Sequence, residues 1–581
     1  MKLVHRLRLP ALFCALAVLL CELVSRPFTA MGIVDDGPYI RMAQHLAQTG
    51  HIVYNGWSAP MLGWQLYLGA AFIRLFGFTF TTVRTSTLLV AAATAWLLQR
   101  TLVRAGISER NATLGTLAFV LSPLYLMLSV TYMTDIDGLF ASVICLYGCL
   151  RALEASSESS TIAWLCFAVV TNAIFGTARQ IPWLGILVMV PCTLYLLRAR
   201  RRVLFAGSAA TFAGALFILA CMGWLLHEPY VVHEHLIPKT YSIAHGLWDI
   251  TYSLLDIPFL LLAIVVLFFP QLRKLRPRTL AVLAVLFAGY CFVAIHPSHL
   301  RSSYLLEPIP EGIGEWVNIH GMFEFLLIKG EQPIFLGRNL QILLTFASFG
   351  GMLGLIVSLL RNRRDVSIAD APSAPTWTQL GLLLGPFTLV YSLLLFPRAS
   401  STGVHDRYLL PLLVIALLCI TRYYQERVRP QIPLAGIVMV CATAIYGTVI
   451  VHNMFSFYRA RAALAAEIRA GGVRDTEVDN GWEYNFVVEL RHSSHINEPN
   501  VPIPADAYVP PTPLPADTCQ MLWYASTPHI RPLYGISFDP NACYGPAPFA
   551  PVHYSRWPYR TPGALYVVRY LPPSQIPHGM P

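Results

Sequence analysis

Two pairs of aspartates lie at the ends of long apolar stretches of this sequence. Asp35 and Asp36 follow the first apolar stretch, and Asp135 and Asp137 come directly before a later one. Carboxylates at the edge of a bilayer are costly unless they are paired or hydrated, so they are usually retained for a function. In such places they act as general bases or as ligands of a divalent cation. Asp35, Asp36 and Asp135 are therefore our candidate catalytic residues.

Each acidic pair also has a structural interpretation. Asp35 or Asp36 could cap a short amphipathic helix that the segment 37–46 predicts, and Asp135 could cap the next apolar helix. A cap needs only one carboxylate at each place, and a cap can also take part in catalysis. The sequence therefore leaves open which aspartate would be the base. It also leaves open whether a divalent cation is needed, and it names no metal ligands.

Two isolated arginines are the strongest candidates for binding a phosphate. Arg179 and Arg407 each lie alone at the end of an apolar stretch. Both ends would face away from the cytoplasm, where membrane proteins carry few arginines. A guanidinium group can donate two parallel hydrogen bonds to a phosphate and neutralise it as it leaves. The alternative is that both arginines reach lipid headgroups. Tyr408 and Lys239 complete the candidate substrate-binding residues.

The elements that position these residues are long apolar helices. Hydrophobic residues make up 55% of the chain and charged residues 12%, against about 25% charged residues in a soluble domain. Apolar stretches of about 18 to 22 residues recur, and each can cross the hydrocarbon core. We expect a mainly α, polytopic membrane protein with about thirteen spans, near residues 10–24, 83–102, 113–130, 138–153, 161–178, 181–197, 203–226, 253–270, 279–295, 340–360, 377–396, 408–420 and 432–451.

The distribution of basic residues predicts the orientation of these spans. The formal net charge of +10 could suggest nucleic-acid binding. However, the arginines cluster in short loops between apolar stretches, as in the positive-inside pattern of membrane proteins. Assigning those loops to the cytoplasm places both acidic sites and the C-terminal region on the extracytoplasmic face. The segment 60–76 then fits an interfacial helix better than a span.

We expect two domains. Residues 1–451 would form the transmembrane catalytic domain, with 25–82 as its first extracytoplasmic loop. Residues 452–581 are rich in Pro, Gly and Tyr and predict a small extracytoplasmic α+β or loop-rich domain. Cys519 and Cys543 are the only cysteines there, and an oxidising compartment would favour a disulfide between them. Two free buried thiols are the alternative.

Four motifs of the sequence resemble those of the GT-C glycosyltransferases. Asp-Asp-Gly-Pro-Tyr at Asp35 resembles their first acidic motif, and Met-Thr-Asp ending at Asp135 resembles their second. Asp-Arg-Tyr-Leu-Leu-Pro from Asp406 resembles a segment that begins a late span, and Ala-Pro-Met-Leu from Ala59 stands where many members have Pro-Pro-Leu. The group includes protein O-mannosyltransferases, aminoarabinose transferases that modify lipid A, and related Rhizobium lipopolysaccharide transferases.

The resemblance implies a membrane glycosyltransferase that moves a sugar from a polyprenyl-phosphate donor to an extracytoplasmic glycan, glycolipid or protein, with inversion. The expected setting is a bacterial plasma membrane, with the bilayer, donor and acceptor as partners and no nucleic acid. The second acidic residue is Asp36 where the group usually has Glu, and Ile136 and Asp137 replace a common small residue and Pro. A flippase or secondary transporter would predict inverted repeats and mid-membrane charges instead, and a non-catalytic scaffold would leave the paired carboxylates without a role.

Overall fold

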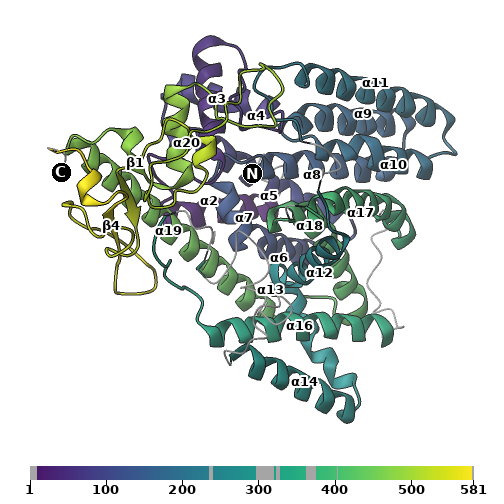
Figure 1. Cartoon of the computed structure of the whole chain (residues 1–581). Coiled ribbons are helices and arrows are strands. Elements are labelled where there is room, and N and C mark those ends of the chain that lie inside the picture. The colour runs from purple at the N-terminus through teal and green to yellow at the C-terminus, as the bar shows by residue number, and fades with distance from the viewer. Residues whose placement is uncertain are drawn as a thin grey trace.

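The computed structural model describes residues 9–234, 240–295, 320–321, 328–361, 374–401 and 403–578. Helices form most of the molecule, and the C-terminal part lies against one side of them (Figure 1). One cluster of buried apolar side chains extends from Cys14 in the first helix to Tyr570 near the end of the chain. A continuous cluster of this kind marks one core, so the C-terminal part shares its core with the helices.

Within the described ranges, eight helices are long and apolar enough to cross a membrane. They are built on α5 (Phe80–Arg104), α8 (Thr134–Glu154), α9 (Glu158–Phe175), α11 (Arg201–Leu225), α16 (Arg338–Arg361), α17 (Trp377–Ala399), α18 (Leu410–Tyr423) and α19 (Leu434–Ala470). Two bent pairs raise the number to ten, namely α6 (Glu109–Val120) with α7 (Pro123–Ser129) and α12 (Ile243–Leu260) with α13 (Leu262–Val265) and the turn that follows. Shorter apolar helices are α2 (Leu9–Ser25), the segment Ile181–Leu196 that ends in α10 (Val190–Leu196), and the described part of α14 (Pro277–Ile295).

The predicted polytopic helical fold is confirmed. Each of the thirteen predicted stretches coincides with a long helix, a bent pair or a short apolar helix. Only eight to ten of these meet the length and composition of a span, so the number thirteen is not confirmed. The side of the membrane on which each loop lies stays a prediction, since it depends on that number.

One predicted span, 113–130, is broken where proline enters the chain. Helix α6 ends at Val120 and α7 begins at Pro123, with a bend of 70° between them. Proline has no N–H to donate and disfavours helical backbone at the residue before it. Ser122 takes that position with extended backbone and its hydroxyl accepts from the N–H of Tyr125. Hydropathy alone carries no sign of this break.

The first loop contains the short helix that the sequence predicts. Helix α3 (Asp36–Thr49) is followed by α4 (Gly63–Phe76). Helix α4, with 14 residues, is not among the candidate spans of the described chain, and its interfacial location stays a prediction. Both helices contact α5, and Asp36 bonds Arg84 of α5 and the backbone N–H of Tyr132, in the loop before α8.

Helix α19 runs through the predicted domain boundary at residue 452. Its 37 residues are unbroken from Leu434 to Ala470. After Val451 charged and polar residues become more frequent, but the six alanines and three arginines of 452–470 favour helix. The change in composition at residue 452 therefore does not coincide with the end of the helix.

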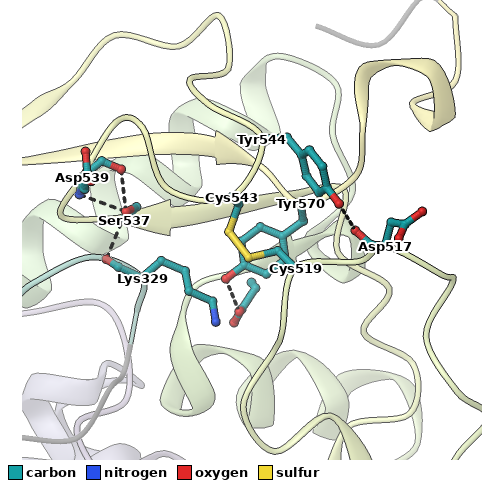
Figure 2. The surroundings of a disulfide bond; sticks show 9 residues. Lys329, Asp517, Cys519, Ser537, Asp539, Cys543, Tyr544 and Tyr570 are labelled. Carbon is teal, nitrogen blue, oxygen red and sulfur yellow. Dashed lines mark hydrogen bonds between the residues drawn. A yellow bond between two sulfur atoms is a disulfide. The ribbon is translucent and has the colours of Figure 1, made fainter.

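The C-terminal tail beyond α19 combines one helix with a small sheet. Helix α20 (Gly481–His492) follows β1 (Val478–Asp479), and the strand order is β1-β2-β4-β3. Strands β1 and β2 (Tyr534–Ser537) are parallel, and β4 (Gly563–Arg569) is antiparallel to β2 and to β3 (Val552–Tyr554). Cys519 and Cys543 form a disulfide beside β4, with Cα atoms 5.7 Å apart (Figure 2).

Helix α20 packs against α3, next to the acidic pair (Figure 1). The approach is close enough to require glycine. A Cβ atom on Gly37 would lie 2.8 Å from a methyl group of Val487, and one on Gly32 would lie 3.3 Å from the carbonyl oxygen of Glu483. The tail therefore forms part of the support of the first loop.

Candidate active site

Asp35 lies at the N-terminal end of α3 but does not cap it. Its side chain makes no capping hydrogen bond. Instead its carboxylate accepts from both terminal nitrogens of Arg407, at 3.3 and 3.4 Å, across 372 residues of sequence. The Asp35 side chain keeps 16% of its surface exposed. Val34, the residue before it, has a φ of 52°, which is unfavourable for a β-branched residue. Such strain persists only where the surroundings enforce it, so the loop fixes the position of Asp35.

Asp36 has the opposite environment. It is completely buried and its carboxylate bonds Arg84 twice, at 2.7 and 3.0 Å. It also accepts from the backbone N–H of Ile33 at 2.7 Å and of Tyr132 at 3.2 Å. These four bonds tie together the loop of Asp35, helix α5 and the loop that leads to Asp135. The geometry favours a positioning role for Asp36 over proton transfer.

Asp135 and Arg179 form the second acid–base pair of the site. The N-cap position of α8 belongs to Met133, so Asp135 is the second residue of the helix, within its first turn, and is not its cap. Its carboxylate is ion-paired with a terminal nitrogen of Arg179. The Asp135 side chain is 2% exposed, whereas that of Arg179 is 22% exposed. Arg179 therefore presents the accessible end of this pair.

Tyr408 joins the two pairs and reveals a cation that the sequence analysis missed. The guanidinium carbons of Arg179, Arg398 and Arg407 lie 4.7, 5.0 and 5.3 Å from the centre of its ring. Tyr391 fixes the backbone at this point by donating its hydroxyl to the Tyr408 carbonyl at 2.7 Å. Arg398 also approaches Glu234 at 3.4 Å. The sequence could have indicated Arg398, because it lies with Arg407 in the segment 397–407, between the predicted spans 377–396 and 408–420.

Tyr39 is a second residue that the sequence analysis did not select. It lies one turn into α3 and is 6% exposed. Burial, together with the charges of Asp35 and Asp135, raises the pKa of Tyr39 well above its ordinary value, although Arg407 opposes this shift. The phenol therefore remains a hydrogen-bond donor beside both aspartates. The signal for it was its position in the first acidic motif.

The remaining candidates lie apart from this cluster or outside the described residues. Asp137 is 1% exposed, and neither of its carboxylate oxygens has a hydrogen-bond partner among the described residues. Lys239 falls in 235–239, outside the described residues. No group of three or more His, Cys, Asp or Glu that could hold a metal ion occurs in the part of the chain that the structure describes.

The cluster has the chemistry of group transfer away from a phosphate. Asp35 is the partly accessible carboxylate, and three guanidinium groups surround the neighbouring Tyr408. Each guanidinium group has a carboxylate partner, namely Asp35 for Arg407, Asp135 for Arg179 and Glu234 for Arg398. A phosphate that takes the place of one of these carboxylates would be stabilised by the same guanidinium groups.

Comparison with known proteins agrees with this chemistry. Residues 58–227 match the family described as dolichyl-phosphate-mannose-protein mannosyltransferase. This segment includes Asp135 and Arg179. No curated protein sequence matches the chain.

Three solved structures are similar in overall shape at low identity. The ArnT structures of Cupriavidus metallidurans in the apo state and bound to undecaprenyl phosphate show 12% and 13% identity, with TM-scores of 0.38 and 0.41. They cover 81% and 96% of this chain and 83% and 97% of their own. The Archaeoglobus fulgidus oligosaccharyltransferase complex with zinc and sulfate shows 13% identity and a TM-score of 0.43, over 90% of this chain and 67% of that one.

The family match confirms the predicted relation and the predicted class of activity. It falls on the same helices and acidic motif that the sequence analysis selected, within a polytopic helical fold. Residues 58–227 are thus similar to a family of glycosyltransferases, and the chain around them folds as a polytopic helical protein.

Proposed function

We propose that this enzyme transfers a sugar from a polyprenyl-phosphate donor to an extracytoplasmic glycan, glycolipid or protein, with inversion at the anomeric carbon. The observation that carries the proposal is the apposition of a partly accessible Asp35 with Arg407 and Arg179 around Tyr408. The description of the matching family, which names a dolichyl-phosphate-linked sugar as donor, supports a lipid-phosphate donor here.

The transfer is a single displacement. The acceptor hydroxyl gives its proton to the Asp35 carboxylate while its oxygen bonds to the anomeric carbon. The bond between that carbon and the phosphate oxygen breaks, and the electron pair leaves with the phosphate. Arg407 and Arg179 neutralise the added charge, and the geometry of guanidinium suits a phosphate.

The ion pairs of the site predict an order for this reaction. Arg407 is held by Asp35, and Arg179 by Asp135. A phosphate that binds both arginines draws them away from their carboxylates. Asp35 then gives up its contact with Arg407 and can accept a proton from the acceptor. Donor binding would therefore precede activation of the acceptor.

Sugar transfer by the purified protein in lipid nanodiscs tests the proposal. A panel of synthetic polyprenyl-phosphate sugars would be supplied with and without acceptor, and free lipid phosphate would be measured. We expect slow hydrolysis of at least one donor with water as acceptor and faster turnover with a glycan acceptor. Movement of intact donor across a liposome bilayer, with no release of lipid phosphate, would indicate a flippase and overturn the proposal.

The location that we propose is a bacterial plasma membrane, with the active site and C-terminus extracytoplasmic. Single cysteines at exposed positions of the first loop and tail, in a background without the native cysteines, would be labelled in intact cells with a membrane-impermeant maleimide. We expect labelling at His51 and Ser494 without permeabilisation. Labelling of either position only after permeabilisation would contradict the common extracytoplasmic side.

A further inference from the structure

We infer that a basic and aromatic surface beside α2 and α19 binds the headgroups of anionic phospholipids. Three parts of the chain form this surface, which we call the headgroup patch. They are the end of α2, helix α19 and the loop 555–562 between β3 and β4 of the tail. The residues of the patch are Arg26, Phe28, Arg459, Arg556, Trp557 and Tyr559. The inference goes beyond the reaction proposed above and does not depend on it.

Direct contacts join the three parts of the patch. Helix α19 packs against both α2 and β3 (Figure 1). Arg459 donates to the backbone carbonyl of Arg26 at 2.8 Å. His452 of α19 stacks on Trp557 with ring centres 3.6 Å apart, and its Nδ1 donates to the carbonyl of Ser25 at 3.2 Å. The end of α2, the helix and the tail loop therefore form one continuous surface.

The arginines of the patch have no acidic partner. In the part of the chain that the structure describes, Arg459 and Arg556 donate to backbone carbonyls, and no carboxylate is ion-paired with them or with Arg26. The three arginines around Tyr408, in contrast, each have a carboxylate partner. The loop 555–562 also contains no Asp or Glu. This unneutralised charge attracts a phosphate group, and it favours a net negative headgroup over a zwitterionic one, whose cation it repels.

Exposed apolar side chains lie beside these charges. Phe28, Trp557 and Tyr559 are exposed, and so are Leu23 and Val24 in the last turn of α2. Trp and Tyr collect at the boundary between hydrocarbon and headgroups because each combines an apolar ring with a polar N–H or O–H. A soluble anion makes no use of such apolar surface. The patch therefore fits a ligand that has acyl chains as well as a phosphate.

The patch also lies at the depth of the headgroups. The 18 residues from Leu434 to Val451 carry no charged side chain. At about 1.5 Å per residue they extend about 27 Å, close to the thickness of the hydrocarbon core. Asn453 follows directly, and its side-chain amide binds the N–H and the carbonyl of Trp557 at 2.7 and 2.8 Å. The tail loop is thus attached to α19 where a helix near the membrane normal leaves the hydrocarbon.

Native mass spectrometry of the full-length protein in detergent tests the inference. The probes are phosphatidylglycerol and phosphatidylcholine with the same acyl chains. The patch variant combines Arg26→Gln with Arg459→Gln. The control variant combines Arg469→Gln with Arg491→Gln and removes the same charge from two half-exposed arginines that share Asp475 as partner.

We expect wild type and the control variant to bind phosphatidylglycerol more tightly than phosphatidylcholine. The patch variant should lose about fivefold of its affinity for phosphatidylglycerol for each arginine removed, about 25-fold in all, and should bind phosphatidylcholine as wild type does. Phosphatidylglycerol should also raise the thermal unfolding midpoint of wild type more than that of the patch variant, since a ligand of the folded state stabilises it. Arg556→Gln alone, in the tail loop, should lose about fivefold and gives a second test should the patch variant fold poorly.

Equal affinities of wild type for the two lipids, or the same loss in the control variant as in the patch variant, would overturn the inference. Displacement of phosphatidylglycerol by millimolar inorganic phosphate would assign the patch to a soluble anion instead. A tenfold rise in the donor KM of the patch variant would assign it to the phosphate of the donor, and would likewise overturn the inference. Lipid binding is measured without turnover, so an absence of sugar transfer would refute the proposed reaction and leave the headgroup patch standing.

Discussion

The adjacent residues Asp35 and Asp36 each pair with an arginine, but the two pairs differ in their exposure to solvent. Asp36 and Arg84 are sealed from solvent, with side chains 0% and 3% exposed, and the carboxylate accepts four hydrogen bonds. Asp35 and Arg407 are joined at 3.3 to 3.4 Å and keep 16% and 9% of their side chains accessible. The Asp36–Arg84 pair, which we call the clamp, is therefore fixed. The Asp35–Arg407 pair, which we call the openable pair, can separate.

The difference shows how a loop can place a reactive carboxylate. Breaking a buried pair by removing one partner is strongly destabilising, so the clamp keeps its geometry through the reaction. In the openable pair, Arg407 can leave Asp35 and bind a phosphate instead. Because Asp35 directly precedes the clamped residue Asp36 in the sequence, its backbone position is fixed by Asp36, although its own side chain keeps 16% of its surface exposed.

The largest effect is expected for Asp35→Asn. Loss of a positioned base lowers rates by about 10²–10⁴, while folding should be unchanged because Asp35 caps no helix. Release of lipid phosphate with saturating acceptor, measured per folded molecule, checks this. Asp506→Asn, at an exposed site of the tail, is the control and should behave as wild type. Near-normal transfer by Asp35→Asn would show that Asp35 is not the base, and the two pairs would then not differ in function.

The second prediction concerns the clamp. Asp36→Asn keeps the size of the side chain but leaves the Arg84 charge buried and unpaired, which costs about 3–5 kcal/mol of folding stability. We expect a clear fall in the thermal unfolding midpoint of the solubilised protein, which Asp35→Asn should not show. Unchanged stability combined with lost activity would move Asp36 from the clamp to the chemistry.

Substitutions of the two arginines should affect different properties, namely donor use for Arg407 and stability for Arg84. Arg407→Ala should lower kcat/KM for the donor about 10- to 10²-fold, the effect of one charge-assisted hydrogen bond, and Arg407→Lys should recover part because the charge remains without the fork. Arg84→Lys should lower the unfolding midpoint instead. Donor titrations at fixed acceptor measure the first effect. A donor dependence equal to wild type for both Arg407 variants would return this residue to lipid-headgroup contact.

The smallest effect is expected for Tyr39→Phe. The raised pKa of Tyr39 keeps the phenol protonated at and above pH 10, its ordinary titration range. Any fall in rate between pH 8 and about 10 therefore belongs to another group and should persist in Tyr39→Phe, whose rate should drop only about threefold to tenfold through loss of one hydrogen bond. A pH–rate profile of both proteins checks this. Disappearance of the alkaline fall in the variant would show that Tyr39 titrates there.

The sequence indicated the candidate site residues but not the ion pairs that these residues form. Hydropathy located the apolar helices because a bilayer sets their length. Asp35 and Arg407, however, meet across 372 residues, and no local pattern specifies such a pairing. Arg84 was counted with an apolar span, so the clamp was not predicted. The continuity of α19 was missed because a fall in hydropathy at Val451 resembles a domain boundary, although helix propensity continued past it.

The length of α19 sets the distance of the tail from the start of this helix. With a rise of about 1.5 Å per residue, the 37 residues of this helix extend about 55 Å, roughly twice the thickness of the hydrocarbon core. Phe457 lies about 35 Å from the Leu434 end by the same rise. For a helix that crosses near the membrane normal, the segment from Phe457 to Ala470 then lies beyond the hydrocarbon core. A change in the number of residues between Leu434 and Phe457 would therefore move the tail, and α20 with it, relative to the bilayer.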